Sequence, residues 1–122
     1  MDFIEQELEL INLTPHDIVL VDENNDPIIT IQPSGKLARV STSTEMVGVI
    51  RVKGKRIRVT ESEFGEVTGL PDPTPGVAYV VSLAVINALK KKRITRTDLF
   101  IPNESVRNDK GQVVGCKSVG IA

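Results

Sequence analysis

Short apolar runs, each ended by polar or turn-forming residues, make up the first third of the chain. Residues 8–13 and 18–21 are separated by the tripeptide TPH and Asp17, and residues 28–32 follow the polar stretch 22–27. Short runs of aliphatic and β-branched residues bounded by Asn, Asp and Pro are typical of strands. The pattern therefore predicts two strands broken at a Thr-Pro corner, and then a hairpin joining residues 18–21 to 28–32.

The middle of the chain continues this strand pattern after the turn sequence PSG. Three further short strands are predicted, over residues 37–40, 47–53 and 56–60. The Gly54-Lys55 step is a tight-turn signal between the last two. Because alternate residues of a strand share a face, Ile57 and Val59 are expected on one face and Arg56 and Arg58 on the other.

A loop and a helix are predicted next. Residues 65–76, GEVTGLPDPTPG, hold three prolines and three glycines, which predicts a rigid loop over most of this length. The run VAYVVS then reads as a strand. Ser82 is a good helix N-cap, and the segment LAVINALKKK places lysines at the negative end of the helix dipole, so one helix is expected near residues 82–92.

The last quarter returns to strand character. Residues 99–101, 105–107 and 112–116 are predicted strands, the last two joined by a turn at 108–111. About nine short strands and one helix make the expected fold α+β, a small antiparallel β-dominated domain of short strands. The 122 residues are of a size for one domain, assigned to residues 1–122.

Charge is balanced overall but unevenly distributed along the chain. Fifteen Lys and Arg against 16 Asp and Glu leave a formal charge of −1, which argues against nucleic acid polymers and anionic membranes as partners. Residues 2–26 nevertheless carry eight acids and no Lys or Arg, whereas 51–58 and 90–96 are basic. Such segregation suits either solvated surface or a contact between subunits. Together with the edge strands that a β-rich domain must cover, it leads us to expect a homo-oligomer.

Residue types that carry catalysis or bind metals are scarce. The chain has one His, His16, and one Cys, Cys116, and it contains no paired Cys or His motif of a zinc site. We expect no metal, no cofactor and no catalytic residue, and we interpret His16 as a structural residue of the corner. The absence of a signal-peptide pattern and of a bilayer-length apolar run predicts a cytoplasmic protein.

Six segments in order carry a resemblance to a known group of proteins. They are NLTPH, PSGKLARV, GEVTGLPDPTPG, YVVS, TDLFIPN and VGC, which span about residues 10–116. The chain resembles a family of short proteins of phages, prophages and their bacterial hosts. Its size and scarcity of catalytic groups are also similar to phage anti-defence proteins that act as sponges, in particular the first Thoeris anti-defence family. This resemblance implies an oligomer that sequesters cyclic ADP-ribose signals made by TIR enzymes in the host cytoplasm, with cyclic oligonucleotides as the other possible ligand class.

A nucleotide of this class presents phosphates, ribose hydroxyls and a purine face, and side-chain chemistry alone suggests which residues contact each part. Arginine forks suit phosphate, Asp and Asn suit ribose, and aromatic side chains suit the base. The ligand-binding candidates are Arg39, Arg56, Arg58 and Arg107 for phosphate, Asp98, Asn103 and Asp109 for ribose, and Phe64, Tyr79 and Phe100 for the base. Each arginine alone is also ordinary surface charge.

Two other functions are open at this point. The chain could be a protein-binding module that blocks a host enzyme through an edge strand or the Pro-rich loop. It could also be a small nucleotide hydrolase or lyase in which His16 or a carboxylate pair acts as the base. Non-enzymatic sequestration is the function that the sequence favours.

Overall fold

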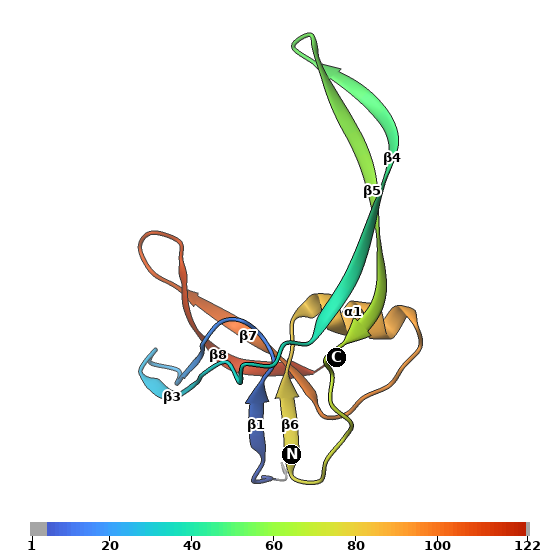
Figure 1. Ribbon diagram of the computed structural model, residues 1–122. Helices are drawn as coiled ribbons and strands as arrows, with labels where there is room; N and C mark the ends of the chain where they lie inside the picture. Colours follow the sequence, from blue (N-terminus) through green and yellow to red (C-terminus); the bar gives the residue numbers. More distant parts are fainter. Residues whose placement is uncertain (1–4, 122) are drawn as a thin grey trace.

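A six-stranded sheet and a long two-stranded hairpin dominate the computed structural model, which describes residues 5–121 (Figure 1). The sheet has the strand order β1-β6-β7-β8-β2-β3, and β4 pairs with β5 outside it. The strands are β1 (Glu9–Asn12), β2 (Ile18–Val21), β3 (Pro27–Ile31), β4 (Arg39–Val52), β5 (Lys55–Thr68), β6 (Val77–Val80), β7 (Leu99–Arg107) and β8 (Val113–Ile121). The helix is α1 (Leu83–Lys91). The prediction of a β-dominated fold with one helix near residues 82–92 is therefore confirmed.

The sheet is mixed, which corrects the expectation of an antiparallel fold. β1 pairs with β6, β6 with β7 and β2 with β8 in parallel, whereas β2–β3 and β7–β8 are antiparallel hairpins. The parallel β6–β7 pair follows from the helix between them, because a crossover through a helix returns the chain in the same direction. Sequence periodicity does not specify which strands become neighbours, so the parallel pairs were not predicted.

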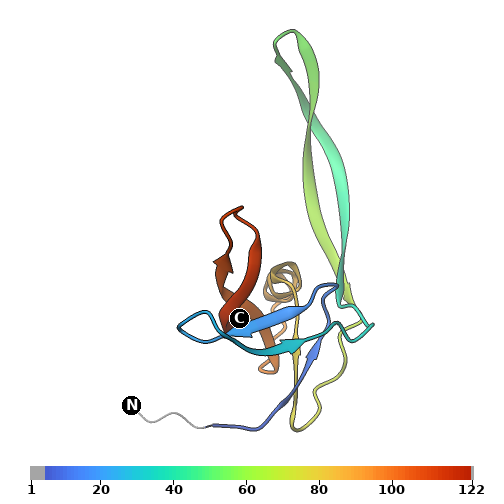
Figure 2. The ribbon, with the colours of Figure 1, turned by 90° about the vertical axis from the view of Figure 1, so that its left-hand side faces the viewer.

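The hairpin of β4 and β5 is the largest departure from the predicted strands. The three short strands expected between residues 37 and 60 are two continuous strands of 14 residues each, joined at the Lys53-Gly54 turn. β5 runs through Gly65 to Thr68, so the Pro-rich loop begins at Gly69 and not at Gly65. At about 3.3 Å per residue the hairpin is roughly 45 Å long, and Figures 1 and 2 show it projecting from the sheet as an arm. We call residues 39–68 the arm.

Helix α1 forms the centre of the main core. Val85, Ile86 and Leu89 pack on side chains from the sheet, including Tyr79 and Leu99. The base of the arm joins the same cluster through Val40 and Val67, which are partly buried. A second cluster joins Ile18 of β2, Val80 of β6 and Cys116 of β8. Cys116 is a free, buried thiol, and burial raises its pKa.

No helix within residues 5–121 combines the length and the apolar character needed to cross a bilayer.

Candidate functional site

The NLTPH segment is an internally hydrogen-bonded corner built around Asn12. The Asn12 side chain is 1% exposed, and its Oδ1 accepts bonds from the backbone N–H of Thr14 at 2.9 Å and from the Thr14 hydroxyl at 2.7 Å. Its Nδ2 donates to the carbonyl of His16 at 2.7 Å and to that of Ile31 at 3.0 Å. The buried Asn12 amide thus connects the ends of β1 and β3 to the corner. Its four hydrogen bonds are made to Thr14, His16 and Ile31.

His16 takes part in the corner through its backbone. Its carbonyl accepts the bond from Asn12, and its N–H donates to the Thr14 hydroxyl oxygen at 3.4 Å. The residue itself is exposed. Within residues 5–121 no three His, Cys, Asp or Glu side chains lie close enough together to hold a metal ion. The backbone geometry explains why a polar tripeptide stands between two strands: Pro15 restricts the chain direction, and Asn12 satisfies the donors and acceptors that the corner leaves unpaired.

An open groove of about 800 Å³ adjoins this corner. Its walls are mainly apolar and come from the corner, β2, the end of β6, β7 and β8. The lining residues are Thr14, Pro15, His16, Asp17, Ile18, Val19, Val81, Ser82, Pro102, Ser105, Val113, Val114, Gly115 and Cys116. A volume of this size, with apolar walls and a few polar groups, is typical of small-molecule sites.

The groove lies where two parallel strands end and the helix begins. β1 and β6 run in the same direction and end at Asn12 and Val80, so the segments that follow them meet at one edge of the sheet. Ser82, the N-cap residue of α1, lines the groove, and its hydroxyl makes no capping hydrogen bond. The first N–H groups of a helix lack partners within the helix and favour an anion. The groove therefore offers hydroxyl groups and a helix N-terminus beside apolar walls.

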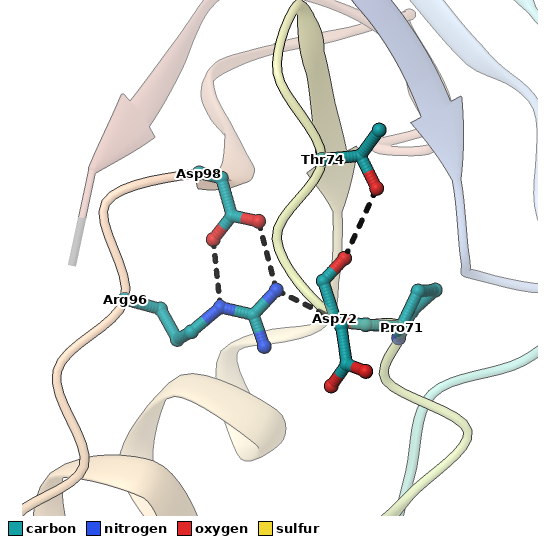
Figure 3. Close-up of polar contacts among 5 residues, drawn as sticks. All are labelled: Pro71, Asp72, Thr74, Arg96 and Asp98. Carbon is teal, nitrogen blue, oxygen red and sulfur yellow. Dashed lines mark hydrogen bonds and ion pairs between the residues drawn. The ribbon is translucent and has the colours of Figure 1, made fainter.

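A second polar cluster fixes the Pro-rich loop to the segment before β7 (Figure 3). Arg96 forms a bidentate pair with the Asp98 carboxylate, with Nε and Nη2 each 2.8 Å from an oxygen, and its Nη2 also donates to the Pro71 carbonyl at 2.8 Å. Both side chains are about 15% exposed. The hydrogen bonds from Arg96 lower the pKa of Asp98 below its ordinary value of 3.8, against the opposing effect of burial. This pair is a structural clamp on the loop.

The clamp predicts a loss of stability in acid. The pKa of Asp98 is lower in the folded state than in the unfolded state, so the ionised side chain stabilises the fold. This stabilisation is present above the ordinary pKa of 3.8 and is lost as the pH falls through the folded-state pKa. Asp98→Asn is expected to reduce the free energy of unfolding by about 2 kcal/mol at pH 7 and by less at an acidic pH below the folded-state pKa of Asp98. Urea denaturation at both pH values measures this. The exposed Asp109→Asn is the control, and an equal loss at both pH values would refute the clamp.

The ten residues predicted to contact ligand lie in separate parts of the molecule. Arg39, Arg56, Arg58 and Phe64 are on the arm, Phe100, Asn103 and Arg107 are on β7, and Asp109 is in the β7–β8 turn. Arg107 donates to the Gly111 carbonyl at 2.7 Å within that turn. Tyr79 is buried in the core, and Asp98 is engaged by Arg96, so neither presents a free surface to a ligand. None of the ten lines the groove.

The sequence reasoning did not identify the groove residues. The sequence indicates only a capping role for Ser82 and gives no signal for Ser105 or Asp17. One signal was available: NLTPH and YVVS both end apolar runs with hydroxyl or polar residues, and parallel neighbours would bring these ends together. Without knowledge that β1 and β6 are parallel, the two segments could not be connected. Arg56 and Arg58 do share one face of the arm, as predicted from alternation.

No family model, curated protein or solved structure matches this chain.

Proposed function

We propose that this protein binds a small nucleotide-derived signal of the cyclic ADP-ribose class and sequesters it without turnover. The observation that supports this most directly is the groove beside the NLTPH corner, whose volume of about 800 Å³ suits a ligand of that size. The proposal retains the anti-defence role in the host cytoplasm that the sequence resemblance implies. We also propose that the protein is a homo-oligomer.

The groove can meet each part of such a ligand. The N-terminus of α1 at Ser82 suits a phosphate, because unpaired N–H groups and the helix dipole favour negative charge there. The hydroxyl of Ser105 and the carboxylate of Asp17 suit ribose hydroxyls. The aliphatic wall of Val19, Val113 and Val114 suits a purine face. We therefore propose the groove, and not the arginines of the arm, as the ligand site.

Calorimetric titration with cyclic ADP-ribose tests the placement. A sponge must bind at low signal concentration, so we expect a dissociation constant near nanomolar, about −12 kcal/mol. Ser105→Trp at the exposed rim is expected to fill the groove and weaken binding at least about a hundredfold, while Ser82→Ala costs about tenfold through one lost hydrogen bond. Ser105 and Ser82 are exposed, so both variants are expected to remain folded.

The arm provides the matched control. Arg56→Ala and Arg58→Ala are expected to bind cyclic ADP-ribose within about threefold of the parent, because both residues lie outside the groove. If the arginines instead contact phosphate, each alanine variant would lose about 1.5–3 kcal/mol of affinity. Loss of affinity in the arm variants, with full affinity in Ser105→Trp, would contradict the proposed site.

A further inference from the structure

The two faces of the arm differ in chemistry, as the pairing of β4 with β5 determines. One face carries the rungs Arg51–Arg56, Val49–Arg58 and Met46–Thr60 in its outer half. On the opposite face the rungs are Val52–Lys55, Ile50–Ile57, Gly48–Val59, Glu45–Glu61 and Ser43–Glu63. Directly opposed residues of an antiparallel pair project to the same side, so each rung lies on one face. We call the second set of rungs the aliphatic face.

The aliphatic face is exposed although it is apolar in its outer half. Val52, Ile50, Ile57 and Val59 are between 36% and 51% exposed. Within residues 5–121, helix α1 is the element that packs substantially on the arm, and it contacts the base of the arm. Figures 1 and 2 show the outer half of the arm clear of the sheet. A two-stranded ribbon alone is marginally stable in water, so this face requires cover.

Charge is arranged along the same face in a self-complementary order. Lys55 and the turn residue Lys53 lie at the tip side of the aliphatic rungs, and Glu45, Glu61 and Glu63 lie at the base side. Glu45 and Glu61 are directly opposed, and like charges so placed destabilise a hairpin unless a cation adjoins them. A surface with its cations at one end and its anions at the other pairs with an inverted copy of itself.

We propose that the arms of two copies of this chain pack antiparallel through their aliphatic faces, about a twofold axis at the Ile50–Ile57 rung. In that arrangement Ile57 meets Ile57 of the second copy, and Val52 lies over Gly48, where a Cβ would have nothing within 4 Å. Lys55, on the same rung as Val52, then lies over Val59 of the second copy, one rung from its Glu61 and within reach of a lysine side chain, and the turn residue Lys53 lies level with the Glu45–Glu61 rung. Twofold pairing of one patch with itself is the usual form of a homodimer interface.

Sedimentation equilibrium tests the pairing. A contact confined to the arms is smaller than a standard protein interface, so a dimer of 13.3 kDa subunits with a micromolar dissociation constant is expected. Ile57→Glu is expected to give monomers, because it places two charges against each other at the axis. Val49→Glu, on the opposite face at similar exposure, is expected to remain dimeric. A parent protein that is monomeric at about 0.1 mM would overturn the proposal, as would a dimer that survives Ile57→Glu.

Charge exchange and cross-linking test the antiparallel order. Glu61→Lys and Lys55→Glu are each expected to raise the dimer dissociation constant about tenfold or more, and the double variant is expected to recover most of the loss. Ile57→Cys is expected to form a disulfide-linked dimer on oxidation, whereas Val49→Cys is not; the native Cys116 is buried and does not interfere. Equal cross-linking from both faces, or no recovery in the double variant, would contradict the antiparallel arrangement. Arm pairing is independent of ligand binding in the groove.

Discussion

Asn12→Asp is expected to reduce the free energy of unfolding by about 4 kcal/mol at pH 7. The substitution keeps the size of the side chain and the acceptor that serves Thr14. It replaces the donor Nδ2 by an oxygen facing the carbonyls of His16 and Ile31, which lie 2.7 and 3.0 Å from Nδ2. A carboxylate at 1% exposure loses its hydration, and the described hydrogen-bond partners of this side chain, the Thr14 N–H and hydroxyl and the carbonyls of His16 and Ile31, carry no positive charge.

Urea denaturation of the Asn12→Asp variant should show a penalty that shrinks as the pH is lowered. Protonation restores one O–H donor, so the loss is fully present only well above the ordinary aspartate pKa of about 3.9. Asn87→Asp, on the exposed face of α1, is the control and is expected to change stability by about 0.5 kcal/mol or less. A stable Asn12→Asp protein at pH 7 would show that the corner does not depend on this amide.

Gly69→Ala is expected to cost about 3 kcal/mol or more, because two independent penalties act at this position. Gly69 has φ +78°, a left-handed conformation that costs a residue with a Cβ about 1 kcal/mol or more. A Cβ there would also clash with the backbone carbonyl of Leu37, which cannot swing aside as a side chain could. Gly69 follows β5 directly, so the clash would separate the base of the arm from the segment that leads into β4.

Gly76→Ala separates the two penalties at Gly69. Gly76 has nearly the same φ, +76°, but nothing lies within 4 Å of an added Cβ. We expect Gly76→Ala to lose about 1 kcal/mol, the conformational part alone. Chemical denaturation of both variants gives the comparison, and equal losses would mean that the contact with Leu37 contributes nothing.

The local elements were predictable where one residue pattern dominates. The β2–β3 hairpin follows from the DENNDP turn, the helix from Ser82 and its aliphatic run, and the β7–β8 turn from residues 108–111. The length of the arm was not predictable. Its inner half is rich in Ser, Thr and Glu, which lack the apolar alternation of a half-buried strand, and it remains a strand because it pairs with its neighbour across 14 residues.

The candidate site could not be predicted from the sequence, because its residues come from segments that only the folded sheet brings together. Arginines that look concentrated along the chain are spread over the 14-residue strands of the arm and the β7–β8 hairpin, because strands separate residues by about 3.3 Å per position. The groove instead forms between segments that are distant in sequence, near Thr14, Ser82 and Ser105. The role of Asn12 was equally hidden, since the sequence does not reveal that the Asn at the end of this strand is buried and makes four hydrogen bonds to three residues.

Recovery of an intact ligand tests the sequestration proposal most directly. The protein is incubated with cyclic ADP-ribose, separated from free ligand by gel filtration, denatured by heat, and the released small molecules are identified by mass spectrometry. Sequestration in the groove predicts that unchanged cyclic ADP-ribose returns in near-stoichiometric amount from the parent and is absent from Ser105→Trp. Release of a product with a different mass would mean turnover, and protein-bound ligand that is undiminished in Ser105→Trp, or no bound ligand at all in the parent, would contradict the proposed function.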